Sequence, residues 1–446
     1  MISDDKQEVT LEEIADFQKG FAFKSADFQK VGTKIVKVSN LTLDSIDEDS
    51  CICIDNLKAS QYLRYELLNN DIVITTVGSW PSNPASVVGK VIRVPAGFNH
   101  SLLNQNAVRV RAKKGINQQF LYYLLKSGYF KEYIIGTAQG SANQASITQN
   151  DIKAFKYPIP DLVQQEKIGL VLKTIDDKME LNNSINKNLE ETAQALFKRW
   201  FVDFEFPNEN GEPYKSSGGE FEESDWGMIP KGWNIGFLSD ILSLNKNSTK
   251  AGNHLKNRPY VPIDVIPMHS LSLNSYKSWE EAQSSLITFE KGDILLGAMR
   301  VYFHRVAVAP FAGVTRTTCF VLRPKEKSDL GFASLLVFHD DTIKFANSTS
   351  QGTTIPYAVW ENGLAIMKVV IPASDKRKEF NELINPMLNK FHEILKENIA
   401  LTHLRDSLLP KLMSGEIRVP FNDEYPISRS FDLPLAAESN AQYSTT

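Results

Sequence analysis

The sequence has few cysteines, no long apolar run and no excess of one charge. Its three cysteines, Cys51, Cys53 and Cys319, form no CxxC pair and have no pair of histidines nearby, which argues against a zinc site or a disulfide framework. We expect them to be small buried side chains. No apolar stretch has membrane-spanning length, and the opening MISDDKQEVT lacks the basic segment and apolar run of a signal peptide, so we predict a cytoplasmic protein.

Signatures of catalysis are also missing. Gly89-Lys90 lacks the leading glycine and the following serine or threonine of a phosphate-binding P-loop. Asn83-Pro84-Ala85 lacks the second proline and the aromatic residue of the adenine-methyltransferase tetrapeptide. His392-Glu393 is not part of an HExxH zinc motif. The sequence therefore supports no catalytic, metal or cofactor site.

The net charge of -4 is unevenly distributed along the chain. Residues 8–160 carry 17 basic and 14 acidic residues, and residues 232–372 carry 14 and 11, so both stretches are mildly basic. The acidic excess lies in residues 204–231, with 2 basic and 7 acidic residues, and in the tail from residue 416 onward. Two basic stretches permit phosphate binding without demonstrating it.

The chain contains the same pattern twice. A constant offset of 212 residues joins the two copies, and upstream it becomes 222, as expected when loops differ in length. The sequence therefore predicts a tandem duplication of a globular unit followed by a long helix. Matching positions include Phe120 and Phe332, Gln139-Gly140 and Gln351-Gly352, Ile159-Pro160 and Ile371-Pro372, and, at the larger offset, Asp71-Ile72 and Asp293-Ile294.

An apolar seam recurs every three to four residues through 162–203, without proline, and again at the same offset through 373–415. This spacing predicts two long helices. The first, capped by Asp161, would reach roughly 60 Å, more than one domain core needs. The seam positions are Ile168, Leu172, Ile175, Met179, Asn186, Leu189, Leu196, Trp200, Ile384, Phe391, Ile394, Asn398, Leu401, Leu408 and Leu412.

Two such helices can bury their seams against each other. If they pair antiparallel, the two globular units lie at opposite ends of the pair, in a pseudo-twofold arrangement. Asn186 and Asn398 occupy equivalent seam positions, where a polar side chain lowers stability but selects register and partner. The alternative is that both face solvent, because the helices diverge or bend near Asn182-Asn183.

The predicted fold class is α+β, with two tandem mixed α/β domains, each followed by a long helix, and the two helices forming an antiparallel coiled coil. Leu11, Ile14 and Phe17 have helical spacing, and residues 204–231, rich in glycine, proline, serine and acid, predict a linker. Further expected elements of the first unit are strands at 71–77, 87–94 and 107–112, a helix over 117–135 and a polar loop over 136–146. Those of the second are strands at 260–266, 292–299, 305–309, 318–324 and 367–372, a helix over 331–348, and polar loops over 300–305 and 348–354.

Polar and partly basic residues occupy matching loops in both units. Asn, Gln and Arg can bind base edges through paired hydrogen bonds, and Ser and Thr suit phosphates, although ordinary surface loops use the same residues. The candidate DNA-binding residues are Ser79, Trp80, Asn83, Asn104, Gln105, Asn106, Arg109, Gln139, Ser141, Asn143 and Gln144 in the first unit, and Arg300, Tyr302, His304, Arg305, Thr315, Arg316, Thr317, Gln351, Thr353 and Thr354 in the second.

Two stretches resemble a known family. The run NKNLEETAQALFKRWFVDFEFPNENGEPYKSSGGE, followed by WGMIPKGW, and the later run NIALTHLRDSLLPKLMSGEI are similar to the central and distal repeat regions of the DNA specificity subunits of type I restriction-modification systems. KYPIPDLVQQEKI and KVVIPASDKRKEF, before the two helices, resemble that family too. The resemblance covers the plan of residues 8–415. One departure is that QGTTIPYAVW lacks the polar run of QGSANQASIT, which weakens the case for base contacts there.

The resemblance implies that each recognition domain reads one half of a bipartite, asymmetric site in double-stranded DNA. It also implies that two methyltransferase subunits dock on the helices and that restriction/motor subunits cut the DNA, so this chain is no enzyme. S-adenosylmethionine, ATP and Mg would belong to those partners, and this chain would bind none. The implied domains are target recognition domain 1 (1–160), a central helix (161–203), a linker (204–231), target recognition domain 2 (232–372), a distal helix (373–415) and a partly disordered tail (416–446).

Other functions remain open at this point. The chain could serve a methyltransferase without restriction subunits, which its sequence cannot distinguish. A helical structural adaptor without DNA binding explains the long helices but not two elaborate basic domains. A self-sufficient restriction or methylation enzyme would need a cofactor or metal motif, which the sequence lacks.

Overall fold

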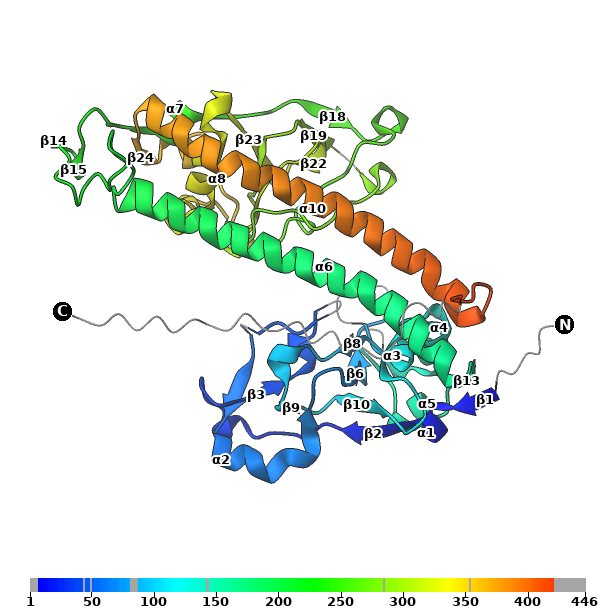
Figure 1. Ribbon diagram of the computed structural model, residues 1–446. Coiled ribbons are helices and arrows are strands. Elements are labelled where there is room, and N and C mark those ends of the chain that lie inside the picture. Colours follow the sequence, from blue (N-terminus) through cyan, green and yellow to red (C-terminus); the bar gives the residue numbers. More distant parts are fainter. Residues whose placement is uncertain are drawn as a thin grey trace. The chain divides into compact units, whose positions relative to one another are not determined.

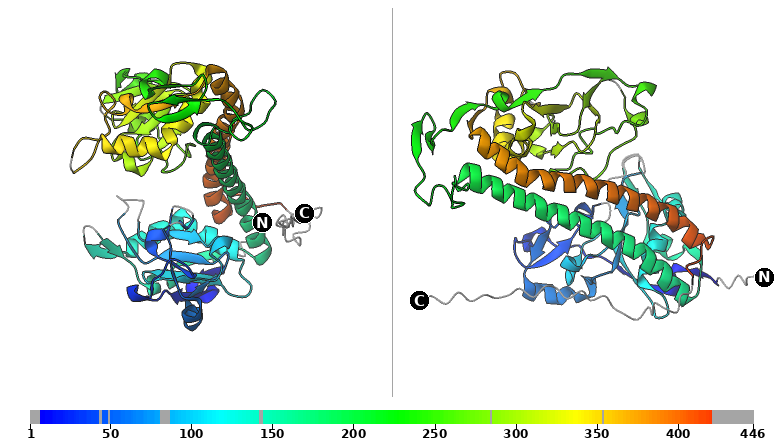
Figure 2. Two further views of the ribbon diagram at one scale, coloured as in Figure 1. Left: turned by 90° about the vertical axis from the view of Figure 1, so that its left-hand side faces the viewer. Right: turned by 45° about the horizontal axis from the view of Figure 1, so that its top comes forward.

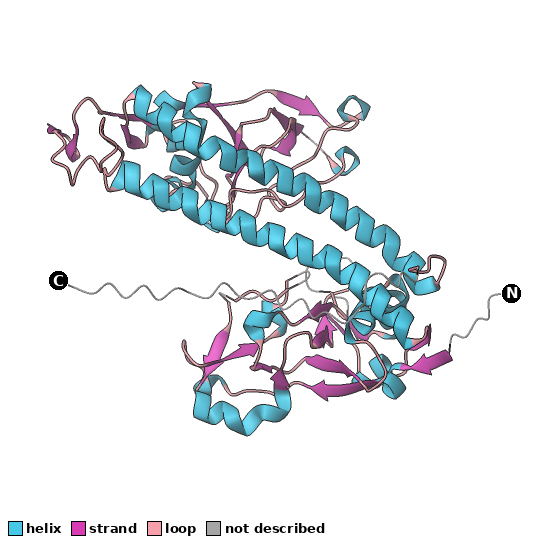
Figure 3. Cartoon of the chain, viewed as in Figure 1, coloured by secondary structure: helices cyan, strands magenta, loops and turns pink. Residues whose placement is uncertain are grey.

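The computed structural model describes residues 7–42, 45–48, 50–80, 87–141, 144–283, 285–352 and 354–420 (Figure 1). The chain divides into two compact units: unit 1 is Met1–Lys173 with Ser407–Thr446, and unit 2 is Thr174–Asp406. Both units mix helices and strands (Figure 3), as the predicted α+β class requires. Over the described part of the chain, the helices include none that is long and apolar enough to cross a membrane.

The main sheet of unit 1 is antiparallel, with the order β2-β10-β6-β8. Its apolar side chains, such as Ile72, Ile74 and Val110, pack with those of the helices that follow it. A short pairing of β1 with β13 joins the start of the domain to the strand before the long helix. These elements are β1 (Gln7–Thr10), α1 (Leu11–Ile14), β2 (Ala15–Lys19), β6 (Ile72–Thr75), β8 (Val91–Arg93), β10 (Ala107–Ala112), α3 (Gln118–Lys126), α4 (Gly128–Thr137), α5 (Gln149–Lys153) and β13 (Lys156–Ile159).

Two smaller sheets complete unit 1. The mixed sheet β4-β3-β9-β5 carries its own small core around Ile35, Ile54 and Leu102. In the sheet β11-β12-β7, the strands β11 and β12 lie in the stretch 136–146 that was expected to be a loop. The elements are η1 (Ser25–Asp27), β3 (Thr33–Val36), η2 (Val38–Asn40), β4 (Ile52–Ile54), α2 (Asn56–Ala59), η3 (Ser60–Tyr65), β5 (Glu66–Leu67), β7 (Val77–Gly78), η5 (Ala96–Phe98), β9 (Ser101–Leu103), β11 (Gln139–Ser141) and β12 (Gln144–Ser146).

Unit 2 repeats this plan. The strand β16 pairs with β24 as β1 pairs with β13, and the sheet β17-β23-β20-β21 has the arrangement of β2-β10-β6-β8. The additional sheet differs, with the order β18-β19-β22. The elements are β16 (Asn234–Phe237), α7 (Leu238–Ile241), β17 (Leu242–Leu244), β18 (Ser248–Lys250), η7 (Asn253–Leu255), η8 (Trp279–Glu281), β19 (Ser285–Phe289), β20 (Ile294–Gly297), η9 (Val301–Phe303), β21 (Val306–Val308), β22 (Gly313–Arg316), β23 (Cys319–Pro324), η10 (Lys327–Asp329), α8 (Leu330–Phe338), α9 (Asp340–Ser348), η11 (Leu364–Ile366) and β24 (Lys368–Ile371).

The two predicted long helices are present as α6 (Leu162–Phe197), which continues into the π-helical turn η6 (Lys198–Val202), and α10 (Ser374–Ser414). Asp161 caps the first, because its Oδ1 accepts a hydrogen bond from the N–H of Gln164 at 2.9 Å. Within unit 2 the helices run side by side and antiparallel (Figures 1 and 2). Trp200 packs on Phe380 at one end, and Arg405 bonds Asp176 at 3.1 Å at the other.

The polar seam residues Asn182 and Asn186 are buried between these helices, and Asn398 is half-buried. Asn182 donates hydrogen bonds to Asn398 and Glu397, both at 2.8 Å, and Asn398 donates to Asn183 at 3.1 Å. Asn186 is also buried, so the solvent-facing alternative is wrong for it, and α6 continues through 182–183. Asn398 therefore contacts Asn182, because equivalent positions of antiparallel helices lie at different levels.

A buried carboxylate fixes α6 to the globular part of unit 2. Glu190 Oε1 accepts hydrogen bonds from the N–H of Leu271 at 2.6 Å, the N–H of Ser272 at 2.9 Å and the hydroxyl of Ser270 at 2.7 Å. Burial raises the pKa of Glu190, and these bonds oppose the rise. The helix thus reaches the domain through a specific polar contact in addition to its apolar seam.

Several expected elements differ from the observed ones. The helix expected at 11–17 ends at Ile14, and Phe17 lies in β2, because the main sheet takes over the chain there. The helix expected over 117–135 is two helices, since Ser127 is extended and caps α4. No strand forms over the expected range 260–266, in which only Tyr260 makes isolated bridges. Three segments expected to be loops form the hairpin β11-β12, the 3-10 turn η9 and part of β22.

The predicted linker is an ordered segment. It contains the hairpin of β14 (Phe221–Ser224) and β15 (Gly227–Pro230). Phe206 stacks between Tyr214, at 4.4 Å between ring centroids, and Trp233, at 4.8 Å. Its composition suggested a linker because glycine, proline and acid dominate it, but the aromatic side chains spaced along it supply an apolar core. The predicted tail lies outside the described residues beyond position 420.

Candidate nucleic-acid interface

The predicted loops of unit 1 meet at Thr76, directly after strand β6. The N–H of Thr76 donates to the carbonyl of Asn106 at 2.8 Å, and the carbonyl of Thr76 accepts from the N–H of Ile147 at 2.9 Å. These two bonds join the segments 76–80, 104–106 and 139–147. We call this meeting point the loop junction of unit 1.

Unit 2 has the same junction, centred on Ala298. Its N–H donates to the carbonyl of Thr318 at 2.9 Å, and its carbonyl accepts from the N–H of Ala358 at 2.8 Å. Ala298 and Thr318 are the residues that the sequence offsets assign to Thr76 and Asn106. Both junction bonds of unit 1 therefore have counterparts in unit 2, while the loop residues differ.

Five of the unit 1 candidates are exposed around the junction: Gln105, Asn106, Gln139, Ser141 and Gln144. Trp80 also lies there, and its indole N–H donates to the carbonyl of Ser141 at 2.8 Å. Ser79 bridges Val87 through its backbone. Asn104 is buried, with its Oδ1 accepting from the N–H of Gln105 at 2.6 Å. The remaining candidates Asn83 and Asn143 lie outside the described residues.

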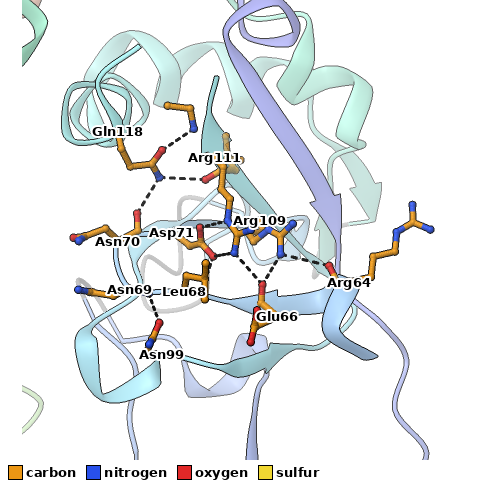
Figure 4. A network of polar contacts seen from close by, with 12 residues as sticks. Arg64, Glu66, Leu68, Asn69, Asn70, Asp71, Asn99, Arg109, Arg111 and Gln118 are labelled. Carbon is orange, nitrogen blue, oxygen red and sulfur yellow. Dashed lines mark hydrogen bonds and ion pairs between the residues drawn. The ribbon is translucent and has the colours of Figure 1, made fainter. Parts of the chain in front are cut away.

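Arg109 turns into the domain. It lies in β10, half-buried, and its Nη1 donates to the carbonyl of Glu66 and, at 3.4 Å, to that of Arg64 (Figure 4). Burial, and then the charge of Arg111, lower the pKa of Arg109. The side chain therefore holds the chain at η3 and β5 instead of presenting its guanidinium to solvent.

Exposed candidates also surround the junction of unit 2. Arg316, Thr317, Gln351 and Thr354 are exposed, and Tyr302 is 47% exposed. Tyr357 ties these loops together, because it bridges Gln351 through its backbone and donates its hydroxyl to the carbonyl of Thr317. Arg300 adopts a left-handed conformation with φ 50°, and its N–H donates to Pro356 at 2.7 Å. Thr353 lies outside the described residues.

Three candidates of unit 2 are held inside the domain. Thr315 is fully buried, and its hydroxyl donates to the carbonyl of Val261 at 2.6 Å. His304 is 4% exposed, with Nε2 at 2.7 Å from the carbonyl of Phe338. Arg305 is half-buried and donates to the carbonyl of Ile266. Composition could not separate these side chains from the exposed ones, because the strand β22 and the turn η9 were expected to be loops.

A pocket of about 220 Å³ opens beside the junction of unit 2. Its lining includes Met299, Arg316 and Thr318 near the junction, together with Tyr260 and the ion pair of Lys277 with Asp264, at 2.7 Å. Of these residues the sequence indicated only Arg316. Met299 follows β20 and Thr318 precedes β23 of the main sheet, whereas Tyr260 and Lys277 come from loop segments that bridge each other.

Unit 1 contains an aromatic cluster that the loop composition did not indicate. Phe21 lies with its ring centroid 5.1 Å from Tyr65, 4.9 Å from Tyr62 and 5.1 Å from Phe23. The N–H of Gln105 donates to the carbonyl of Phe21 at 2.9 Å, so the cluster adjoins the junction. The signal in the sequence was the aromatic and basic run GFAFKSADFQK.

Comparisons with known proteins agree with this arrangement. A family model described as type I restriction modification DNA specificity domain matches residues 3–191 and 230–401. The MjaIX specificity subunit of a type I restriction enzyme from Methanocaldococcus jannaschii is 28% identical over 357 residues, covering 75% of this chain and 78% of that protein. The HindI specificity subunit from Haemophilus influenzae is 22% identical over 357 residues, covering 67% and 77%.

The fold is also that of a solved relative. The crystal structure of a type I restriction-modification S subunit from M. genitalium aligns with a TM-score of 0.53 at 14% identity, covering 95% of this chain and 99% of that one. The family model accounts for well over half of the present sequence. The chain therefore belongs to the family of type I restriction-modification DNA specificity subunits.

Proposed function

We propose that this chain recognises a bipartite, asymmetric site in double-stranded DNA, with residues 1–160 reading one half and residues 232–372 reading the other. The observation that supports this is the repeated loop junction. Thr76 and Ala298 make equivalent hydrogen bonds, yet the exposed residues around them are Gln105, Asn106 and Gln144 in one unit and Arg316, Thr317 and Gln351 in the other. One scaffold bearing two different sets of polar side chains suits two different base sequences.

In this proposal the chain is the non-catalytic subunit of a larger complex. Two methyltransferase subunits would dock on the helices α6 and α10, and restriction/motor subunits would join them. The methyltransferase would supply S-adenosylmethionine, and the motor subunits would supply ATP and Mg. Membership of the specificity-subunit family supports this division of labour.

A domain exchange tests the proposal. Residues 232–372 are replaced with the equivalent segment of another specificity subunit, and the sites methylated in a host that expresses the chain with its partners are mapped by sequencing. We expect one half of the recognised site to change and the other half to stay. A change in both halves, or in neither, would contradict the assignment of one half-site to each domain.

Two measurements distinguish the proposed function from the alternative functions. Fluorescence anisotropy with duplex DNA and the methyltransferase partner, across a salt series, should give tight binding that weakens as salt rises. A structural adaptor would show no such binding. Whether restriction subunits accompany the native complex is decided by purifying the tagged chain from its host and identifying what copurifies.

A further inference from the structure

The side chain of Arg109 turns into the domain, whereas that of Arg64 turns out of it. Arg109 donates one hydrogen bond to the carbonyl of Arg64, at 3.4 Å, and another to the carbonyl of Glu66. Figure 4 shows the guanidinium of Arg64 pointing away from this network. The half-buried Arg109 therefore holds the backbone from which the exposed Arg64 projects.

The exposed guanidinium of Arg64 is itself oriented. Its Nε donates to Oε1 of Gln18 at 2.9 Å, and the residue remains exposed. An arginine fixed at Nε presents the edge formed by its two terminal nitrogens, which is the edge that binds two oxygens of a phosphate. Pre-orientation lowers the entropy that the side chain loses on binding.

The residues around Arg64 suit contact with DNA. Its neighbour Tyr65 belongs to the aromatic cluster of Phe21, and the backbone of Phe21 is bonded to Gln105 at the loop junction. Lys19 and Lys24 are exposed on the same stretch, and residues 18–37 contain five lysines and one aspartate. The surface around Arg64 is thus continuous with the junction and carries the charge that phosphates require.

We propose that Arg64 binds a phosphate of the DNA read by the first recognition domain, and that Arg109 is a positioning residue that holds Arg64 in place. This inference rests on the proposed function. It adds a contact outside the polar loops and gives Arg109, an expected DNA contact, a different role.

The test uses the full chain with its methyltransferase partner and a duplex that carries the site found by methylation mapping. Anisotropy is measured for the wild type, Arg64→Gln, Arg64→Lys and Arg109→Lys across a salt series. Loss of one phosphate contact should weaken binding roughly tenfold and make the slope of log K against log salt shallower by about 0.9. Arg64→Lys, which keeps the charge, should retain the wild-type slope. Lys131→Gln, an exposed charge in α4 of the same unit, is the control.

The positioning role has its own measurement. Arg109→Lys should weaken binding as much as Arg64→Gln, and the double variant should be no weaker than either, because both changes remove the same contact. Circular dichroism at the assay temperature checks that Arg109→Lys is folded. A further loss in the double variant, with folding intact, would overturn the positioning role.

The possible failures are distinguishable. If the wild type does not prefer its methylation site to unrelated duplex, the proposed function fails. If it does, and Arg64→Gln behaves as Lys131→Gln does, only the present inference fails. If Arg64→Gln alters the preferred base sequence and leaves the salt slope unchanged, the assignment to a phosphate is wrong.

Discussion

Asp71 accepts two hydrogen bonds from the guanidinium of Arg111, at 2.5 and 2.7 Å, and Asp293 accepts the same two from Arg323, both at 2.7 Å. Each aspartate also accepts from a backbone N–H three residues earlier, at 2.7 Å. Both aspartates are buried, at 4% and 2% exposure. Each aspartate sits directly before β6 or β20, and its arginine lies in the neighbouring strand β10 or β23, so the pair anchors the strand that ends at the loop junction.

Removing the arginine of either pair should destabilise its unit. Arg323→Ala leaves the carboxylate of Asp293 buried with one backbone donor, and we expect a loss of about 2–3 kcal/mol, less than for a fully buried pair because Arg323 is partly exposed. Arg111→Ala should act likewise in unit 1. Urea denaturation followed by circular dichroism measures the loss.

Lys344→Ala is the matched control, since its pair with Asp341 is exposed on both sides. We expect it to change stability by less than about 0.5 kcal/mol. Equal effects of Arg323→Ala and Lys344→Ala would mean that the repeated pair does not support the fold.

The long-range plan of the fold could be predicted from the sequence because it is duplicated. The 212-residue offset located α6 and α10, and β10 and β23 are related by that offset along their whole length. Local details were less accessible. Phe17 has helical spacing with Leu11 and Ile14, but pairing with Val110 in the main sheet fixes it as strand. The spacing of residues along the chain cannot reveal a strand partner that lies 93 positions away.

The candidate site was predicted in outline only. The loops around Gln105 and Gln144 meet within unit 1, and those around Thr317 and Gln351 meet within unit 2, as expected for matching positions in a repeat. Composition could not show that Arg109 and Thr315 turn inward, because orientation depends on which carbonyls lie nearby after folding. Arg64 was missed for the same reason, since its environment is assembled from β2, η3 and β10.

Where the long helix packs against the domain, the glycine lies on the long helix in unit 1 and on the domain helix in unit 2. In unit 1 the long helix carries Gly169, and a Cβ there would lie 2.8 Å from Oδ1 of Asn117 and 3.0 Å from Cβ of Gln119. At the equivalent place in unit 2 the long helix carries Asn381, whose Oδ1 accepts from the N–H of Gly331 at 2.9 Å. One of the two facing positions is a glycine in each copy, so the close approach of helix and domain is preserved.

Substitution of Gly169 should therefore be costly despite its helical conformation. Gly169→Ala forces α6 away from the start of α3, and we expect a loss of about 1–3 kcal/mol. Gly136→Ala is the control, because nothing lies within 4 Å of its Cβ position in α4, and it should gain about 0.5–1 kcal/mol from helix propensity. Thermal unfolding of the two variants measures both changes in stability.

The double variant Gly169→Asn with Gln119→Gly tests the exchange directly. It rebuilds in unit 1 the arrangement of unit 2, so it should be more stable than Gly169→Asn alone. If adding Gln119→Gly brings no recovery, the two positions do not compensate for each other.

Two seam asparagines should respond oppositely to an apolar substitution. Asn182 makes two hydrogen bonds across the helix pair, whereas Oδ1 of Asn186 is buried with no hydrogen-bond partner in the described structure. The pseudo-twofold arrangement explains this difference. The residue expected opposite Asn186 is Ile394, which is the equivalent of Asn182 in the second helix. Ile394 offers no hydrogen-bond donor. We expect Asn186→Leu to raise stability by about 1 kcal/mol and Asn182→Leu to lower it. Chemical denaturation of both variants measures these changes in stability. A lower free energy of unfolding for Asn186→Leu would contradict the prediction.

Acid should destabilise unit 2 through His304. Burial lowers the pKa of His304 below its ordinary value of 6.5, and the nearby His269 acts in the same direction, while the hydrogen bond to Phe338 and the charge of Asp340 oppose it. The folded state therefore favours the neutral ring. Its contribution to stability is complete above pH 6.5 and is lost as the pH falls from there through the lower folded pKa.

The measurement is the melting temperature at pH 8 and pH 5.5. His304→Gln keeps a donor for Phe338 without a titrating ring, so its melting temperature should fall less between the two pH values than that of the wild type. His403→Gln, an exposed position of α10, serves as control and should behave as the wild type does. Equal pH dependence of His304→Gln and wild type would exclude His304 as the cause.

The helix pair should set the number of unspecified base pairs between the two half-sites. Seven residues inserted between Asp176 and Asn182 of α6, together with seven between Asn398 and Arg405 of α10, keep the seam in register, because a heptad preserves which residues face the partner. The insertion adds about 10 Å of helix, close to three base pairs at about 3.4 Å each. We expect methylation mapping to show both half-site sequences unchanged and the spacer longer by about three base pairs.

The same insertion in α6 alone is the control for this prediction. It shifts Asp176 out of step with Arg405 while Asn182 stays opposite Asn398, so the helix pair cannot satisfy both contacts and the chain should lose stability. A paired insertion that folds, methylates DNA and keeps the original spacer would show that something other than the helices determines half-site separation. A changed half-site sequence would instead mean that base reading depends on the helices, which the division into recognition domains and helix pair does not allow.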